Sequence, residues 1–508
     1  MPFKKATDDL LGINGNYFMI TYGETKKNSA FKTYARAKDL PFDIANAISK
    51  KLSEYEKAVK HSDGAEVNIE EYITDPEQLR LLKESEVYQG IIDNISPSPC
   101  FEKGTKILTS KGYKNIEDIK TGDEVITHTN NYRKVITPMK KYSDKIYSVK
   151  VMGNIPIKVT GEHPFYVITR NGSERYWDEK LNKYCTRRKF TAPYWKEAKD
   201  LTKNDFIARA INQNSIIHTW EHSIDHGSNR DISTVNIYNN DFWWLIGRYI
   251  GDGWHTKYIN KQGWIQYYRV IICCNKNNNE LNDITTKMDK CSLKYSIHEE
   301  PTVYKITVSS KDLYEFVDQF GNDCYTKKLT DTIFDLPVDK IKSFLEGYFS
   351  ADGHLMSDGS QSCCSVSYEL ILGIQTCIHK AYKAGTRINV KKGKDDYILC
   401  GRHVKTVNSY DLRFYYETPK TAQYIYKDEH IWQPVREVVE LQYDDYVYNM
   451  SVEQDESYTA NNIIVHNCSH ILLNQDIRRE IGITKIKDVF VANITGKEAD
   501  ELKYLKND

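Results

Sequence analysis

One residue near the start of the chain and three consecutive residues near its end carry side chains suited to acyl transfer. Cys100 begins the segment CFEKGTKIL, and a thiol that follows an amide bond can attack it to form a thioester. His466, Asn467 and Cys468 stand in a row near the other end. Cys468 can accept the acyl group by transesterification. The Asn467 amide can cyclise on its own backbone carbonyl while His466 protonates the leaving amine. These steps predict release of the intervening segment without an external energy source.

A second pattern can activate the upstream amide. Thr160 and His163 form Thr-Gly-Glu-His directly after a predicted strand, so their side chains can converge on one spot. The imidazole can donate to the amide nitrogen, and the hydroxyl can help to place it. We therefore predict that both residues lie beside Cys100.

A repeated pattern carries different chemistry. The segments LIGRYIGDG, ending at Gly253, and LEGYFSADG, ending at Gly353, align position by position. Small residues four apart in each predict two closely packed helices, which would place Asp252 and Asp352 side by side. Adjacent carboxylates repel unless divalent metals bridge them. Bridging metals suit in-line attack on phosphodiesters.

Four motifs resemble those of the inteins, protein-splicing elements with the Hint fold. They are Cys100–Leu108, Thr160–His163, Val447–Glu453 and Ile463–Cys468. The resemblance implies excision of residues 100–467 and ligation of Pro99 to Cys468. It gives catalytic roles to Cys100, Thr160, His163, His466, Asn467 and Cys468. Asn449 and Glu456 stand where many members have Asp and His, and Asn449 cannot act as an acid.

The repeat resembles the LAGLIDADG (DOD-type) homing endonucleases over about residues 240–422. This implies Mg²⁺-dependent double-strand cleavage of a DNA target site by a monomer, with Asp252 and Asp352 as catalytic metal ligands. An intein with a decayed endonuclease is the alternative. Candidate phosphate contacts, each of which is as well explained by a solvated basic surface, are Lys391, Lys392, Lys394, Arg402 and Lys405, and in the charged excursion of residues 171–189 Lys183, Arg187, Arg188 and Lys189.

The order of these motifs predicts a multidomain chain. An all-β Hint (horseshoe) splicing domain, residues 100–239 and 423–467, contains an inserted α/β pseudo-dimer at 240–422. Mixed, mostly helical host segments flank it at 1–99 and 468–508. Ile20–Gly23 and the joined sequence SPSP-CSHILL resemble the bacterial and phage DNA polymerase III alpha subunit, so the remainder of that polymerase is a predicted partner. An unrelated host protein is the alternative.

Composition limits the other classes of function. The 508 residues contain 70 Lys and Arg and 70 Asp and Glu, so any nucleic-acid contact must come from local patches. The 11 cysteines form no paired CxxC clusters at zinc spacing, which favours free thiols in a reducing compartment. No stretch reaches the roughly 18–20 apolar residues of a membrane span. We therefore predict a cytoplasmic protein that does not enter a membrane.

Overall fold

The computed structural model divides the chain into two compact units, with one boundary after Asn467 and the other one residue before the predicted upstream junction. One compact unit is Pro99–Asn467, and the other comprises Met1–Ser98 and Cys468–Asp508. Cys468 itself lies outside the residues that the structure describes, so its predicted role cannot be placed. The described residues are 20–24, 27–38, 40, 42–61, 68–88, 92–97, 99–179, 182–218, 237–276, 279–399, 402–419 and 422–467.

Over its described residues, the flanking unit contains a small helical core and one strand pair. Strand β1 (Ile20–Glu24) pairs with β2 (Ile92–Pro97), which ends at Ser96-Pro97. The apolar positions of the helices pack into one cluster that includes Phe31, Ile48 and Leu52. The helices are α2 (Lys27–Ala37), α3 (Phe42–His61) and α4 (Pro76–Glu84), with 3₁₀ turns η1 (Ile69–Glu71) and η2 (Ser85–Tyr88).

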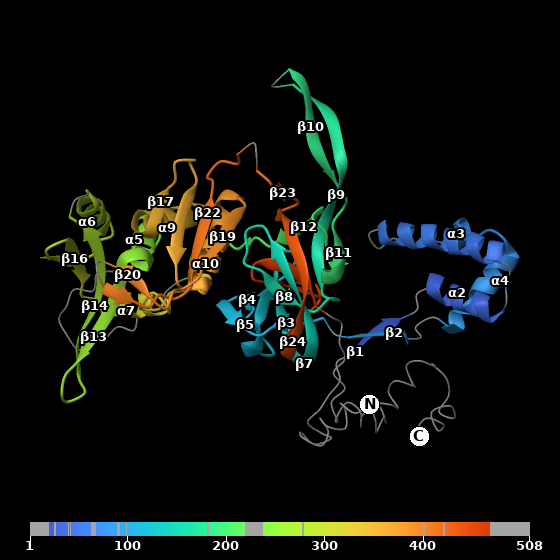
Figure 1. Cartoon of the computed structure of the whole chain (residues 1–508), viewed down its shortest axis with the longest axis horizontal. Coiled ribbons are helices and arrows are strands. Elements are labelled where there is room, and N and C mark those ends of the chain that lie inside the picture. Colours follow the sequence, from blue (N-terminus) through green and yellow to red (C-terminus); the bar gives the residue numbers. More distant parts are fainter. Residues whose placement is uncertain are drawn as a thin grey trace. The chain divides into compact units, whose positions relative to one another are not determined.

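The large unit confirms the predicted β-rich domain. Its 14-stranded sheet is antiparallel throughout, and its longest pairing joins β7 and β24 from Val435 to Val452 on the β24 side (Figure 1). Alternate residues of these strands face one core, which includes Phe101, Phe165 and Tyr458. The strands are β3 (Phe101–Glu102), β4 (Lys106–Thr109), β5 (Gly112–Asn115), β6 (Glu124–Ile126), β7 (Tyr132–Val151), β8 (Ile157–Val159), β9 (Pro164–Asp178), β10 (Lys183–Phe190), β11 (Tyr194–Glu197), β12 (Asp205–Arg209), β23 (Ile425–Lys427), β24 (His430–Val452), β25 (Ser457–Ala460) and β26 (Ile463–His466).

Strand pairing brings the two ends of this unit together. β3 pairs with β8 through Phe101 and Val159, and with β24 through Phe101 and Tyr448. β26 pairs with β25, and Val465 of β26 also pairs with Phe165 of β9. Segments that begin and end the unit therefore share one sheet.

Between β12 and β23 the chain forms the predicted duplicated block. Each copy has a long helix that ends at an aspartate and leads into a four-stranded sheet, with strand orders β13-β14-β16-β15 and β17-β18-β22-β19. The first copy contains α5 (Asn240–Asp252), β13 (Gly253–Ile259), β14 (Ile265–Asn275), α6 (Glu280–Lys290), β15 (Tyr295–Glu299), β16 (Val303–Val308) and α7 (Lys311–Asp318). After α8 (Asp331–Phe334), the second contains α9 (Val338–Asp352), β17 (Gly353–Leu355), β18 (Gln361–Ser365), α10 (Tyr368–Tyr382), β19 (Thr386–Lys391), β20 (Tyr397–Leu399), β21 (Arg402–Val404) and β22 (Ser409–Phe414).

Helices α5 and α9 pack with their backbones in contact, as their small residues predicted. A Cβ atom added at Gly247 would lie 2.0 Å from the Phe344 carbonyl oxygen, and one added at Gly347 would lie 1.9 Å from the Trp244 carbonyl oxygen. Real Cβ atoms do not approach backbone so closely, so any larger residue at either position would separate the helices. This packing aligns the ends of the two helices.

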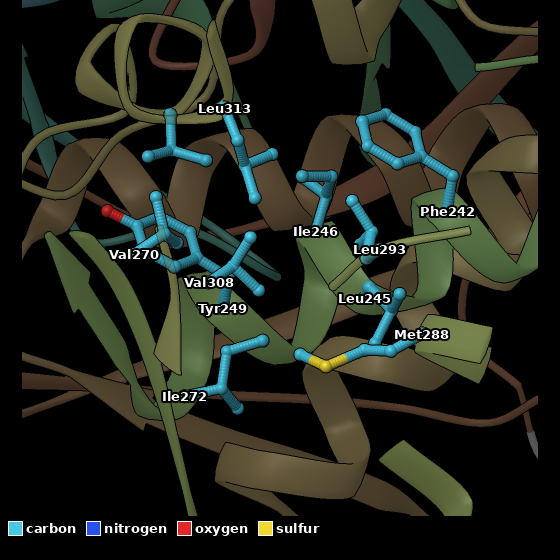
Figure 2. Close-up of a pocket in the computed structure, with 11 residues that line it drawn as sticks. Phe242, Leu245, Ile246, Tyr249, Val270, Ile272, Met288, Leu293, Val308 and Leu313 are labelled. Atoms are coloured by element: carbon cyan, nitrogen blue, oxygen red, sulfur yellow. The ribbon is translucent and has the colours of Figure 1, made fainter. Parts of the chain in front are cut away.

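An apolar cavity of about 20 Å³ lies beside α5 (Figure 2). Aliphatic and aromatic side chains, among them Ile246, Leu293 and Val308, surround it. Without polar partners a water molecule would not be held there. It is therefore a gap in the core of the first copy. Among the described residues, no helix combines the length and the hydropathy that crossing a membrane would need.

Candidate functional site

Cys100 is held in place by Thr160. The backbone N–H of Cys100 donates to Thr160 Oγ1 at 2.8 Å, and the backbone N–H of Thr160 donates to the Cys100 carbonyl at 2.8 Å. Both residues are buried. These two bonds fix the orientation of the Pro99–Cys100 peptide, whose nitrogen is the first of the two donors.

His163 packs against Phe101, the residue that follows Cys100. Its ring centroid is 4.3 Å from that of Phe101 and 6.4 Å from that of Tyr458, and the side chain is fully buried. Its backbone N–H donates to the Thr160 carbonyl at 3.1 Å, which closes a turn between the two residues. The structure thus bonds Thr160 to Cys100 and places His163 against Phe101, while their catalytic roles stay a prediction.

Asn449 binds the carbonyl of the upstream peptide bond, a contact that we did not predict. Its Nδ2 donates to the Pro99 carbonyl oxygen at 2.6 Å. Its Oδ1 accepts from the Met450 N–H and from the Tyr458 hydroxyl, both at 2.7 Å, so the orientation of the amide is fixed. Asn449 cannot exchange a proton as an acid would, but its amide is a donor. The sequence did point to this position, because many inteins have an aspartate there. That pattern indicated an acid, and an amide donor was not predicted.

His466 contacts the carbonyl of the downstream peptide bond. Its Nδ1 is within hydrogen-bonding distance of the Asn467 carbonyl oxygen. Its Nε2 lies 3.9 Å from a carboxylate oxygen of Glu456, and its ring meets that of Trp195 edge-on with centroids 4.7 Å apart. The ring is thereby held against the peptide that follows Asn467.

Asn467 is buried at the end of β26. Its backbone N–H donates to the Glu456 carbonyl at 2.8 Å. With its side-chain amide in the hydrogen-bonded orientation, Nδ2 donates to the same carbonyl at 2.7 Å and Oδ1 accepts from the Val452 N–H at 2.6 Å. The side chain is thus folded back beside its own backbone.

One strand connects the two junctions. Asn449, which contacts the upstream carbonyl, and Val452, which contacts Asn467, are both in β24, three residues apart. At the rise of a β-strand this separation is about 10 Å. The upstream and downstream peptide bonds therefore lie in one neighbourhood of the fold.

A second site lies where α5 and α9 end, at Asp252 and Asp352. Burial, and then repulsion by Asp252, raise the pKa of Asp352 to about 6. Burial also raises the pKa of Asp252, against the attraction of Arg248 and Lys327. The nearby positive charges therefore do not fully offset the burial and mutual repulsion of the two carboxylates.

Lys327 and Arg248 flank the carboxylates, and sequence analysis missed both. The ammonium group of Lys327 donates to the Gly251 carbonyl at 2.9 Å, and burial lowers its pKa. Arg248 Nη2 lies 3.0 Å from Asp252 and 2.8 Å from Glu280. Lys327 belongs to no periodic pattern and reaches the site only through the fold. Arg248 lies inside the repeat, but its counterpart in the second copy is Tyr348, so the duplication did not indicate it.

The aspartates have the chemistry of a site for a hard divalent cation, with carboxylate oxygens that repel in its absence. In the part of the chain that the structure describes, no group of three or more His, Cys, Asp or Glu side chains is placed to hold a metal. A cation bound here would therefore need further oxygens from backbone, water or a phosphodiester.

The predicted phosphate contacts differ in their environments. Lys391, Lys392 and Arg402 are exposed in or beside the second small sheet and the β20–β21 hairpin. In the same region Lys405 pairs with Asp395 at 2.8 Å, and the Lys394 ammonium lies over the Tyr397 ring, 5.4 Å from its centroid.

The excursion of residues 171–189 is a two-stranded hairpin, formed by the distal part of β9 with β10, beyond the pairing with β11 and β12 (Figure 1). Lys183 and Lys189 are exposed there. Arg187 pairs with Glu174 at 2.5 Å. Arg188 differs from the prediction, because its guanidinium donates to the carbonyls of Ala422 and Gln423, each at 3.2 Å, which leaves fewer donors for a phosphate.

Two solved structures resemble parts of this chain at low TM-score. The structure of I-DmoI in complex with DNA and Ca matches with a TM-score of 0.26 and 19% identity, over 34% of this chain and 82% of that chain. The full-length DUF199/WhiA structure from Thermatoga maritima matches with a TM-score of 0.22 and 11% identity, over 35% of this chain and 53% of that one.

Curated relatives are similar over most of this chain. The ATP-dependent DNA helicase Hel308 of Thermococcus kodakarensis is 23% identical over 78% of this chain and 38% of the relative. An uncharacterized protein of Methanocaldococcus jannaschii is 26% identical over 75% and 52%, respectively. A DNA polymerase of Thermococcus sp. is 27% identical over 82% and 23%. The chain thus spans about half or less of the length of these relatives.

Two family models match the segments that carry the junctions. The Hint domain model matches residues 99–160, which include Cys100 and Thr160. The Intein splicing domain model matches residues 189–467, which end at Asn467. This second match covers more than half of the 508 residues, and the chain therefore belongs to the intein splicing domain family.

Proposed function

We propose that this chain is an unspliced precursor that excises residues 100–467 and joins Pro99 to Cys468. The observation that carries the proposal is the buried Asn449 amide on the Pro99 carbonyl, at 2.6 Å, opposite the Thr160 hydroxyl on the Cys100 nitrogen. Both atoms of one peptide bond are thus held by side chains of distant segments. Ordinary structural peptides are satisfied mainly by other backbone groups.

In the first step, the Cys100 thiol attacks the Pro99 carbonyl carbon. The new C–S bond replaces the C–N bond, and the thiol proton ends on the Cys100 nitrogen. Negative charge develops on the Pro99 oxygen, where the Asn449 N–H group already points, and a preorganised donor stabilises such charge. His163, buried against the ring of Phe101, is the proposed proton carrier to the departing nitrogen.

In the next steps, the Cys468 thiol takes the acyl group from Cys100, and Asn467 releases the downstream segment. The Asn467 Nδ2 attacks its own carbonyl carbon, a succinimide forms, and the bond to the Cys468 nitrogen breaks. His466 contacts that carbonyl oxygen, so its N–H group can polarise the carbonyl and then protonate the leaving amine. The thioester at Cys468 finally rearranges to an amide.

Expression of the full chain followed by intact-mass measurement over time tests this function. We expect the wild-type precursor to convert into the excised segment 100–467 and a ligated product of the two flanks. Asn449→Ala should slow thiol-induced cleavage at the upstream junction about 100-fold, the cost of one oxyanion donor. Tyr458→Phe should slow it less, because it only frees the amide to rotate. A wild-type precursor that stays intact, with and without added thiol, would refute the proposal.

A second function, cleavage of double-stranded DNA, is favoured by the carboxylate pair. Asp252 and Asp352 end two helices in backbone contact, and both have raised pKa values. A divalent cation such as Mg²⁺, when bound, would activate water and stabilise the leaving oxygen of a phosphodiester. The two aspartates would hold the cation, and the Lys327 ammonium is near enough to attract a phosphate.

Protonation of the carboxylate pair is predicted to compete with this cation. Because the pKa of Asp352 is about 6, the carboxyl group takes up a proton as the pH falls through that value. We expect the rise in thermal midpoint that Mg²⁺ causes to shrink between about pH 7 and about pH 5. Thermal unfolding of the full chain with and without Mg²⁺ over this range measures the effect. A Mg²⁺ effect that stayed constant across it would contradict the assignment.

Without metal the pH dependence has the opposite sign. A carboxyl with a raised folded-state pKa binds its proton more tightly in the folded state than in the unfolded state, where its value is ordinary. Its contribution therefore weakens the metal-free fold as the pH rises from about 4 through about 6. The thermal midpoints measured with Mg²⁺ and those measured without it should therefore move further apart as the pH increases.

The exposed basic residues around β19 to β21 and on the β9–β10 hairpin are the proposed phosphate contacts. Arg188 is a weaker candidate, because its guanidinium already donates to two backbone carbonyls. The resemblance of the flanks to DNA polymerase III alpha stays a prediction, because the joined motif from Cys468 onward lies outside the described residues. Monomeric state and cytoplasmic location likewise stay predictions.

A further inference from the structure

The hairpin that ends at the downstream junction turns at two asparagines. Asn461 and Asn462 have φ angles of 45° and 60°, and they join β25 to β26. Consecutive left-handed residues define the tight two-residue turns that set hairpin register. This turn fixes the pairing of Ser457 with His466, and a slip of one residue would move His466 to the opposite face.

The side chain of Asn462 is bound by the inserted block. Its Nδ2 donates to the Leu372 carbonyl at 3.1 Å and to Gln375 Oε1 at 2.8 Å, and both partners belong to helix α10. Its Oδ1 accepts a hydrogen bond from the Tyr113 hydroxyl of strand β5. Asn462 is 3% exposed, so water does not replace these partners.

Further buried bonds hold α10 and the turn to the same place. Gln375 Nε2 donates to the Gly153 carbonyl at 2.9 Å, in the segment between β7 and β8. Arg209 Nη1 donates to the Asn462 carbonyl at 3.2 Å and to Asn154 Oδ1 at 3.1 Å. The turn and α10 are therefore both bonded to residues 153–154, the turn through Arg209 and α10 through Gln375.

The apolar packing agrees with these bonds. Leu108, Tyr113 and Ile126 of the splicing sheet belong to the same buried cluster as the apolar residues of α9 and α10. At its edge, Lys106 pairs with Glu369 of α10 at 2.9 Å. Helix α10 is thus packed into the splicing domain as one of its own elements would be.

We infer that helix α10 of the inserted block is part of the splicing machinery, because through Asn462 it positions His466 and Asn467 for release at the downstream junction. Asn462 and Gln375 are positioning residues and do not touch the reacting atoms. The inference rests on the proposed splicing function. It implies that removal of the whole block would impair downstream release while sparing the upstream step.

The test uses Asn462→Gly in the full chain. Glycine keeps the left-handed backbone of the turn and removes only the side-chain bonds. The downstream step is followed alone in a Cys100→Ala background, and the upstream step alone in an Asn467→Ala background with added thiol. Asn182→Gly is the matched control, because Asn182 also has a left-handed φ, 47°, but lies exposed in the β9–β10 turn.

We expect Asn462→Gly to slow downstream release about tenfold or more, as loss of buried hydrogen bonds would. Thiol-induced upstream cleavage should remain within about twofold of the wild-type rate, which a general loss of fold would not allow. Gln375→Ala should reproduce the selective defect from the α10 side, and the double variant should be little worse than either one.

Two outcomes would overturn the inference. Either Asn462→Gly and Gln375→Ala release the downstream segment as fast as Asn182→Gly, or they slow both junctions equally. A wild-type chain that cleaves at neither junction would instead refute the splicing function, and this inference with it.

Discussion

A precursor with alanine in place of Cys100 is expected to retain residues 1–99 under conditions in which the wild type has lost them. The thiol is the proposed nucleophile at the upstream bond. Neither neighbour is placed to replace it, since Thr160 accepts the Cys100 N–H and Asn449 donates to the Pro99 oxygen. Loss of a nucleophile costs on the order of a thousandfold or more. Downstream release should continue, because Asn467 does not need the thioester.

Asn467→Ala is expected to give the complementary pattern. Without the side-chain amide no succinimide forms, so the bond to Cys468 persists, while added thiol still cleaves after Pro99. Intact mass separates these species directly. Cys364→Ala is a suitable control, because Cys364 is an exposed free cysteine of β18. If Cys100→Ala lost residues 1–99 at the wild-type rate, another group would have to be the nucleophile.

The residues proposed for the two junctions could be named from the sequence because their chemistry depends on sequence position. A nucleophile must follow the scissile bond, and a cyclising amide must precede one, so Cys100 and Asn467 mark the boundaries without any knowledge of the fold. The role of Asn449 was not predictable in this way. Its amide matters because β24 passes the Pro99 carbonyl, and that contact joins residues 350 positions apart.

In the inserted block, too, some features could be predicted from the sequence and others depend on the fold. Small residues at a spacing of four predicted the contact of α5 and α9, since helix geometry fixes which residues share a face. The aspartates at the helix ends followed from it. By contrast, Lys327 and the bonds from Asn462 to α10 depend on how separate elements pack, and no period in the sequence encodes such contacts. For a related reason the carbonyl partners of Arg188 could not be predicted, because the sequence showed its charge and not what it would contact.

Replacing Asp352 by asparagine is expected to abolish DNA cleavage and to stabilise the protein at the same time. The substrate for the assay is duplex DNA that encodes residues 1–99 joined directly to 468–508, with Mg²⁺ present. Loss of a bridging carboxylate removes several kcal/mol of transition-state stabilisation, so cleavage should fall about a thousandfold. Splicing should be unchanged, because the aspartate pair and the junctions are separate sites.

Asp352→Asn should increase stability although it removes activity, because burial and the negative charge of Asp252 disfavour the ionised wild-type carboxylate. Burial and the charge of Asp252 raise the pKa of Asp352, which means that the ionised form destabilises the metal-free fold at neutral pH. A neutral amide of similar shape removes that repulsion, so the metal-free thermal midpoint should rise and Mg²⁺ should no longer raise it. Asp358→Asn is the control, since the pKa of Asp358 is lowered by its bonds to Ser360 and its removal should not stabilise. An Asp352→Asn protein that still cut DNA, or that still gained stability from Mg²⁺ as the wild type does, would show that the cation and the scissile phosphate lie elsewhere.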